Sequence, residues 1–144
     1  LLLIHKYIGE IMESEIWMSF QASRGANATL FLGVVIAVWV AARFASVSMD
    51  KGANAVGKVI ISLFALSVFA AGWNMFTYIG NQFVGHAAAF QGLKNSGVEI
   101  SPLAQGFIDT YGTEAITMPN MIGAAFLITG LLIAVLPMWV KTTD

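Results

Sequence analysis

Residues 29–45 read TLFLGVVIAVWVAARFA, and no charged side chain lies between Arg24 and Arg43. Small residues recur in this stretch at every fourth position: Thr29, Gly33, Ala37, Ala41 and Ala45. Four-residue spacing places them on one stripe of a helix, here named the small-residue stripe, while large apolar side chains fill the other faces. Hydrocarbon solvates Leu and Val as well as another helix does, so helices in lipid gain most where small residues let two backbones approach closely. The stretch therefore predicts a membrane-spanning helix with a packing stripe.

The composition of the whole chain agrees with an integral membrane protein. Its 144 residues suffice for one domain. Charged residues make up 10% and hydrophobic residues 58%, whereas soluble domains carry about 25% charged residues. The mean hydropathy is +0.77. A net charge of −1 without any basic cluster argues against a nucleic-acid partner, and the lack of cysteine excludes disulfides, thiolate metal sites and cysteine nucleophiles.

The hydropathy pattern predicts an all-α integral membrane protein with a single domain, residues 1–144. Asn27 is the expected N-cap of the first span, at the end of a polar connector over residues 21–27. A hydrophilic turn over residues 49–58 leads to the second span. Each predicted span has the roughly 20 residues that a helix needs to cross a bilayer. The three spans are residues 29–48, 59–79 and 120–140.

Residues 1–20 are expected to form an amphipathic helix. Its polar face carries Lys6, Glu10 and Glu13 and is net acidic, unlike the basic face of helices that bind anionic lipid. We therefore expect this arm to dock on protein or to lie on a neutral interface. Glu15 falls on the apolar face, beside Ile8. Either the helix frays near Ser14 and leaves Glu15 in water, or the carboxylate is paired and buried against another subunit.

Residues 81–119 form the longest predicted non-spanning segment, an extramembrane loop that is expected to be partly helical. One short helix is predicted over residues 85–94, interrupted by Gly92, and a turn follows over residues 95–97. Ser101 and Pro102 then predict the N-cap and first position of a second helix that runs toward residue 110. Three residues at four-residue spacing give this second helix an apolar face: Leu103, Phe107 and Tyr111.

Few residues offer chemistry. The two histidines, His5 and His86, lie outside the predicted spans, so haem or metal ligation within a span lacks its usual imidazole. No Asp, Glu or Lys falls inside a predicted span, whereas pumps and proton-coupled transporters place such residues at membrane depth. We therefore predict no catalytic residue, no metal site and no cofactor, although bound lipids are expected. The chain is not expected to be an enzyme itself.

The leading hypothesis is a non-catalytic accessory or structural subunit of a larger membrane complex, with other integral membrane subunits and lipids as partners. The small-residue stripe would form the helix interface. Asn74 would contribute either by bonding to a neighbouring helix or as an interfacial residue. In general composition the chain is similar to small accessory subunits of respiratory, photosynthetic and membrane-oxygenase complexes, although no motif ties it to any of them.

The sequence also allows two alternative functions. A homo-oligomeric channel or permease would line its pore with polar residues of the spans: Ser62, Ser67, Asn74, Thr77 and Thr129. A membrane enzyme would use His86 with Asp109 or Glu114. We expect an inner membrane of the bacterial type. The balance of Lys and Arg near the spans favours an orientation with the N-terminus and residues 81–119 outside and the C-terminus in the cytoplasm.

Overall fold

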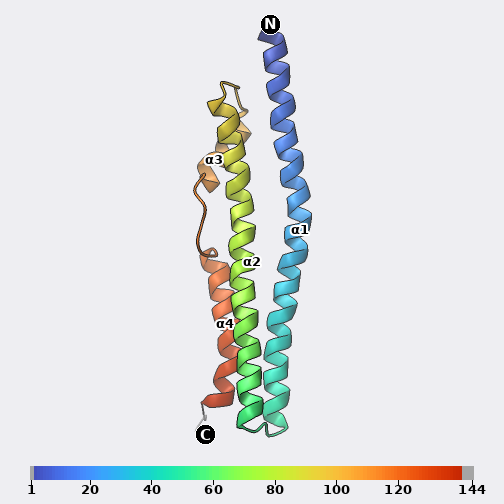
Figure 1. The fold of residues 1–144 in the computed structure, drawn as a ribbon, viewed down its shortest axis with the longest axis vertical. Coiled ribbons are helices and arrows are strands. Elements are labelled where there is room, and N and C mark those ends of the chain that lie inside the picture. Colours follow the sequence, from blue (N-terminus) through green and yellow to red (C-terminus); the bar gives the residue numbers. More distant parts are fainter. Residues whose placement is uncertain (1, 141–144) are drawn as a thin grey trace. The chain divides into compact units, whose positions relative to one another are not determined.

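The structure is a computed structural model that describes residues 2–140, apart from the side chains of Leu2 and His5. Over these residues it is helical and contains no strand (Figure 1). The helices are α1 (Leu2–Asp50), α2 (Ala55–Asn95), α3 (Pro102–Tyr111) and α4 (Met121–Trp139). Three of them, α1, α2 and α4, are long and apolar enough to cross a membrane. The prediction of an all-α chain with three such helices is thus confirmed for the described residues.

The described chain divides into two compact units. Unit 1 comprises residues 2–28 and Tyr78–Thr117, and unit 2 comprises Thr29–Thr77 and residues 118–140. Helices α1 and α2 contribute residues to both units, α3 belongs to unit 1, and α4 belongs to unit 2. The boundary near residue 29 coincides with the start of the uncharged stretch.

Helix α1 is continuous over 49 residues, so the polar connector predicted at residues 21–27 is wrong. Asn27 lies inside the helix and is not its N-cap. Its side chain is 8% exposed, and its Nδ2 has no hydrogen-bond partner among the described residues. Polar residues and one glycine lower helix propensity by up to about 1 kcal/mol each. The buried side chains Phe20 and Val34, which flank the connector, provide packing that outweighs this penalty.

Helix α2 is also longer than predicted, because it runs through residue 79 and on to Asn95. Gly92 does not interrupt it. The segment of α2 in unit 1 buries large apolar side chains, among them Phe90 at 0% exposure and Leu93 at 5%, and this packing exceeds the roughly 1 kcal/mol penalty of one helical glycine. The predicted turn after α2 is confirmed, since Gly97 adopts a φ of +86° and its N–H donates to the Lys94 carbonyl at 3.0 Å.

The core of unit 1 is aromatic. Phe90, Ala104 and Ile108 are buried together, and Trp17 and Phe107 pack against them. The ring centroids of Trp17 and Phe90 are 4.7 Å apart, and those of Trp17 and Phe107 are 5.4 Å apart in an edge-to-face arrangement. These contacts hold α3 against the segments of α1 and α2 that belong to unit 1.

Helix α3 begins as predicted but buries a different face. Ser101 is its N-cap, and the Ser101 hydroxyl accepts a hydrogen bond from the Ala104 N–H at 3.2 Å. The buried residues are Ala104 and Ile108, whereas Leu103, expected on the apolar face, is 70% exposed. The small Ala104 permits the close approach to Phe90 that a larger residue would prevent.

The extended segment after α3 is fixed to α2 by one side chain. Asn81 Nδ2 donates to the Ile116 carbonyl at 2.9 Å, and Asn81 Oδ1 accepts from the Ile116 N–H at 2.8 Å. The Ile116 side chain also lies directly against Gly80, at a place where a Cβ atom would not fit. This pairing satisfies the backbone of a segment that has no secondary structure of its own.

The core of unit 2 consists mainly of small residues contributed by α1, α2 and α4: Ala41, Ala45, Ala65, Ala134 and Met138. The end of α4 is bound to the start of α2, since Lys58 Nζ donates to the Met138 carbonyl at 2.8 Å and Trp139 Nε1 donates to Ser62 Oγ at 2.9 Å. A cation at a helix C-terminus also interacts favourably with the helix dipole.

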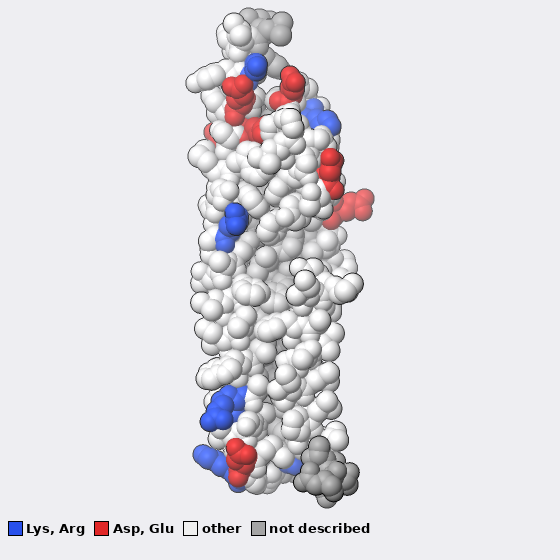
Figure 2. Space-filling view, turned by 180° about the vertical axis from the view of Figure 1, so that it is seen from behind, with Lys and Arg blue, Asp and Glu red and all other residues white. Residues whose placement is uncertain are grey.

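Charged residues in unit 2 are restricted to one end. Residues 29–42, 59–77 and 118–140 contain none. In the face shown in Figure 2, the charged side chains of this unit gather near the end that holds the turn over residues 51–54, and the remaining surface of the unit is uncharged.

Candidate functional site

Unit 2 contains a groove between α1 and α2 with a volume of about 400 Å³, here named the unit 2 groove. Its walls are apolar except for two hydroxyl groups. The residues that line it are Thr29, Leu30, Gly33, Val34 and Ala37 of α1, and Ser67, Val68, Ala71, Gly72 and Met75 of α2. The groove therefore runs along the first half of the small-residue stripe.

The structure divides the small-residue stripe into two parts. Ala41 and Ala45 are each 3% exposed, because α2 and α4 of the same chain pack over them. Thr29, Gly33 and Ala37 instead line the unit 2 groove. A Cβ atom added at Gly33 would meet no atom within 4 Å. Only the first part of the stripe is thus accessible to another helix, since the chain itself covers the second part.

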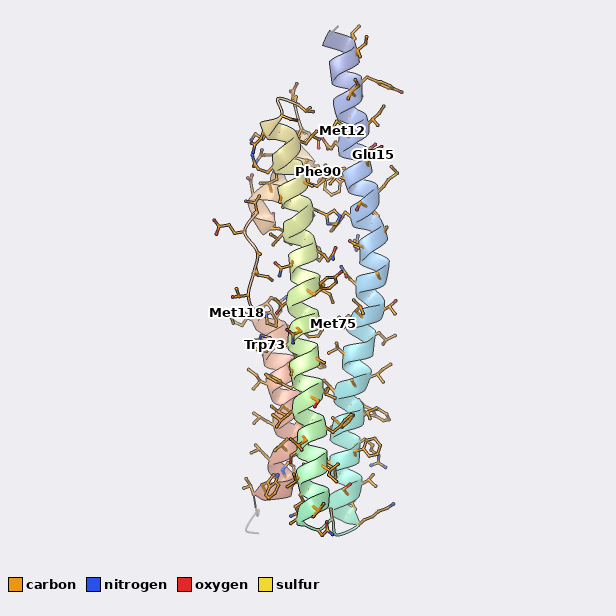
Figure 3. The ribbon with its side chains drawn as sticks, viewed as in Figure 1. Met12, Glu15, Trp73, Met75, Phe90 and Met118 are labelled. Atoms are coloured by element: carbon orange, nitrogen blue, oxygen red, sulfur yellow. The ribbon has the colours of Figure 1, made fainter. Side chains whose placement is uncertain are left out.

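Asn74 lies on the surface of α2, three residues beyond Ala71 of the groove. Its Nδ2 donates to the Ala70 carbonyl of its own helix at 3.0 Å. One amide hydrogen is used in this way, which leaves a second amide hydrogen and the amide oxygen of this exposed residue for other partners. Figure 3 labels Trp73 and Met75, the neighbours of Asn74 on α2. Whether Asn74 bonds to another helix stays a prediction.

The five polar residues of the channel hypothesis have different surroundings. Ser67 lines the unit 2 groove, whereas Ser62 accepts a hydrogen bond from Trp139. Ser67 and Thr77 donate their hydroxyl hydrogens to carbonyls four residues earlier in α2, at 2.9 and 2.8 Å. Thr129 is exposed on α4. The hydroxyls of Ser67 and Thr77 thus satisfy local backbone groups, as Ser and Thr commonly do in apolar helices.

Unit 1 contains a larger open groove of about 760 Å³ between its segments of α1 and α2, here named the unit 1 groove. Figure 3 labels two of its residues on α1, Met12 and Glu15. The α1 wall consists of Met12, Glu15, Ile16 and Ser19. The α2 wall consists of Asn81, Gln82, Gly85, His86, Ala89, Gly92 and Leu93, and Ser96 of the following turn closes it.

Small residues explain why the unit 1 groove stays open. Gly85, Ala89 and Gly92 follow one another at spacings of four and three residues, which places them on one stripe of α2. A Cβ atom at Gly85 or Gly92 would meet no atom within 4 Å. Gly92, which was expected to interrupt the helix, is therefore a helical residue, and its lack of a side chain keeps the groove wall low.

His86 forms the polar centre of the unit 1 groove. Its Nδ1 lies 2.6 Å from the Gln82 carbonyl oxygen and its Nε2 lies 3.3 Å from Ser19 Oγ. A carbonyl oxygen can only accept, so Nδ1 carries a hydrogen, and Nε2 is left to the hydroxyl group of Ser19 as its partner. The edge-to-face contact with Phe20, at 5.4 Å between centroids, fixes the plane of the ring.

Glu15 lies in a continuous helix, so the predicted fraying near Ser14 is wrong. Ser14 Oγ donates to the Ile11 carbonyl at 2.7 Å and leaves the helix intact. The Glu15 side chain is exposed and lines the unit 1 groove. It makes no hydrogen bond or ion pair with any described side chain. Whether it pairs with another subunit stays a prediction.

Glu13, on the other face of the arm, holds the start of α3. Its carboxylate accepts hydrogen bonds from the Ser101 N–H at 2.8 Å, from the Ser101 hydroxyl at 2.5 Å and from Trp17 Nε1 at 3.2 Å. Burial raises the pKa of Glu13, but the hydrogen bonds from Ser101 and Trp17 outweigh it and hold this pKa below its ordinary value. The acidic face of the arm thus serves to bind α3.

The structure does not assemble the residues of the enzyme hypothesis. His86 bonds to Gln82 and Ser19, whereas Asp109 accepts a hydrogen bond from Gln105 at 2.8 Å. Within residues 2–140, no group of three or more His, Asp or Glu is placed to hold a metal ion. The side chain of His5 lies outside the described residues.

The structure thus offers two grooves, one in each unit, as candidate binding surfaces. The unit 2 groove is apolar with small walls, and the unit 1 groove combines apolar residues with Glu15 and the His86–Ser19 pair. No family model, curated protein or solved structure matches this chain.

Proposed function

We propose that this chain is a non-catalytic subunit of a larger integral membrane complex and that a helix of another subunit packs into its unit 2 groove. One observation supports the proposal most: in the uncharged part of unit 2, the groove walls are built from small residues, and the chain's own side chains leave the groove open. An apolar surface of this kind in a membrane is suited to close helix packing.

The gain from such packing comes from contact between backbones. At Gly33 no side chain separates the backbone of α1 from a visiting helix, and Ala37 and Ala71 extend the same low surface. Asn74 adds a polar group beside this surface. Hydrogen bonds between helices in a membrane contribute about 0.6 kcal/mol on average, so the small residues supply most of the affinity and Asn74 supplies orientation.

The membrane placement belongs to the same proposal. Residues 29–48 of α1, the segment of α2 within unit 2, and α4 would cross the bilayer, with unit 1 outside an inner membrane of the bacterial type. The excess of Lys and Arg near the turn over residues 51–54 favours a cytoplasmic position for that turn. Lipid chains would occupy the unit 2 groove in chains that have not yet met their partner.

The test is to fill the groove at a position where the fold tolerates a side chain. Gly33→Leu places its side chain into the groove, and no atom of the chain lies within 4 Å of the new Cβ. Gly25→Leu is the matched control, because Gly25 lies on α1, has equally open surroundings and lines neither groove.

The measurement is a native gel of membranes extracted in mild detergent, with mass spectrometry of the band that contains this chain. The wild type and Gly25→Leu should migrate with larger subunits in a fixed ratio, and Gly33→Leu should be lost from that band. An intact complex with Gly33→Leu would show that the groove is not the interface. A band with only multiples of the 15.4 kDa chain would support the homo-oligomeric channel instead.

A further inference from the structure

We propose that the unit 1 groove receives a helical segment of a partner protein that presents a Lys or Arg side chain to Glu15. This inference concerns a surface that the proposed function does not use. It depends on the shape and the polarity of the groove, which are independent of each other.

The shape of the groove fits a helix. Its α2 wall extends from Asn81 to Leu93, which at 1.5 Å per residue is a length of about 18 Å, or about three helical turns. The groove is open to the surface, and its α2 wall is low at Gly85 and Gly92. A small ligand needs an enclosing pocket, whereas a helix needs a long, shallow and partly apolar channel.

The apolar part of the lining suits the anchors of such a helix. Met12 and Ile16 lie one turn apart on α1. Met12 is 43% exposed, and its unbranched thioether side chain adapts to different neighbours. Apolar residues spaced by three or four positions on the incoming helix would contact these side chains.

The polar part of the lining selects the charge of the partner. Glu15 is the one charged residue among those that line the groove. Ser19 Oγ, the hydrogen-bond partner of His86 Nε2, also lines the groove, and a hydroxyl oxygen has lone pairs that can accept hydrogen bonds. A carboxylate and a hydroxyl acceptor one turn apart favour a cation with several N–H donors, as Lys and Arg provide. An anionic lipid headgroup would be repelled by Glu15.

The experiment uses the full chain in its native membranes. A photoreactive diazirine amino acid replaces Ala89, which is exposed and lines the groove, or Ala88, which is exposed and does not line it. After irradiation, mass spectrometry identifies the crosslinked peptide. We expect an adduct at position 89 to a single helical segment with Lys or Arg within one turn of the crosslink, and at least tenfold less adduct at position 88.

Two pairs of variants test the charge and the shape. Glu15→Lys should lower the adduct at position 89 at least tenfold, whereas Glu10→Lys, on an exposed residue of α1 that lies outside the groove, should not. Gly92→Leu should lower it as well, because its side chain fills the groove. Gly106→Leu on α3, with equally open surroundings, is the control.

A charge exchange completes the test. Replacing the crosslinked partner's basic residue with Glu in the Glu15→Lys background should restore the adduct. An adduct to a second copy of this chain, an adduct to lipid alone, or a yield that does not respond to Glu15→Lys would each overturn the proposal. The Gly33→Leu variant distinguishes this proposal from the proposed function, because loss of the unit 2 interface should leave the adduct yield at position 89 unchanged.

Discussion

Replacing Gly72 with Ala should weaken the packing of α2 against α4 in unit 2. A Cβ atom at this position would lie 2.6 Å from Leu127 Cδ2 and 3.2 Å from Val34 Cγ1. Both distances are shorter than ordinary van der Waals contact between carbon atoms. Leu127 is 1% exposed, so its side chain would have to shift inside a packed site to admit the new Cβ atom.

The magnitude follows from two opposing terms. Forcing an extra carbon into a well-packed site costs about 1–3 kcal/mol. A change from Gly to Ala inside a helix stabilises that helix by about 1 kcal/mol. Gly72→Ala should therefore destabilise the fold by about 0–2 kcal/mol. Gly33→Ala gains the helix term without the steric term, because its Cβ meets no atom within 4 Å. The two variants should thus differ by the steric term alone, about 1–3 kcal/mol.

The assay is reversible unfolding in detergent micelles, followed by steric trapping or by the loss of helical circular dichroism. Leu127→Ala combined with Gly72→Ala provides the internal check. Removing the obstructing atoms should cancel the steric term of Gly72→Ala and leave the helix gain of about 1 kcal/mol, with a coupling energy of about 1–3 kcal/mol. Equal free energies of unfolding for Gly72→Ala and Gly33→Ala would refute the close approach of α2 and α4 described here.

Two further predictions concern unit 1. Asn81→Ala removes both hydrogen bonds to Ile116; the cost should be about 1–3 kcal/mol, and amide hydrogen exchange of residues 112–119 should accelerate while that of α3 changes less. Acidification should loosen α3 through Glu13. Because the pKa of Glu13 is lowered in the folded state, its contribution is complete above the unfolded value of about 4.3 and is lost as the pH falls toward the folded pKa. Hydrogen exchange of residues 98–111 should therefore rise at low pH, by more in the wild type than in Glu13→Gln; equal profiles would contradict this.

Features encoded by short-range patterns were predictable from the sequence. The apolar stretches indicated three long helices, and Ser101 with Pro102 marked the start of α3, because capping and the fixed φ of proline depend on adjacent residues. Asn120 likewise begins α4, with its side chain accepting a hydrogen bond from the Gly123 N–H. Each of these signals depends on residues within one helical turn.

Features set by pairing between distant segments were not predictable. The polar residues 21–27 resemble a connector locally, and the side chains that keep them helical pack through tertiary contacts. The contact between His86 and Ser19 spans 67 residues, and that between Glu13 and Ser101 spans 88. The burial of Ala41 by the chain itself depends on where α4 lies, and no local pattern reports this.

The interleaving of the two units along the chain has a consequence for biosynthesis. All segments of unit 1 precede residue 118, whereas unit 2 needs α4, and the contact between Lys58 and Met138 spans 80 residues. The ribosome therefore releases a complete unit 1 while the α1 and α2 segments of unit 2 still lack their third helix. During that interval Ala65 and Gly72 lack the contacts that α4 supplies once it has been synthesised.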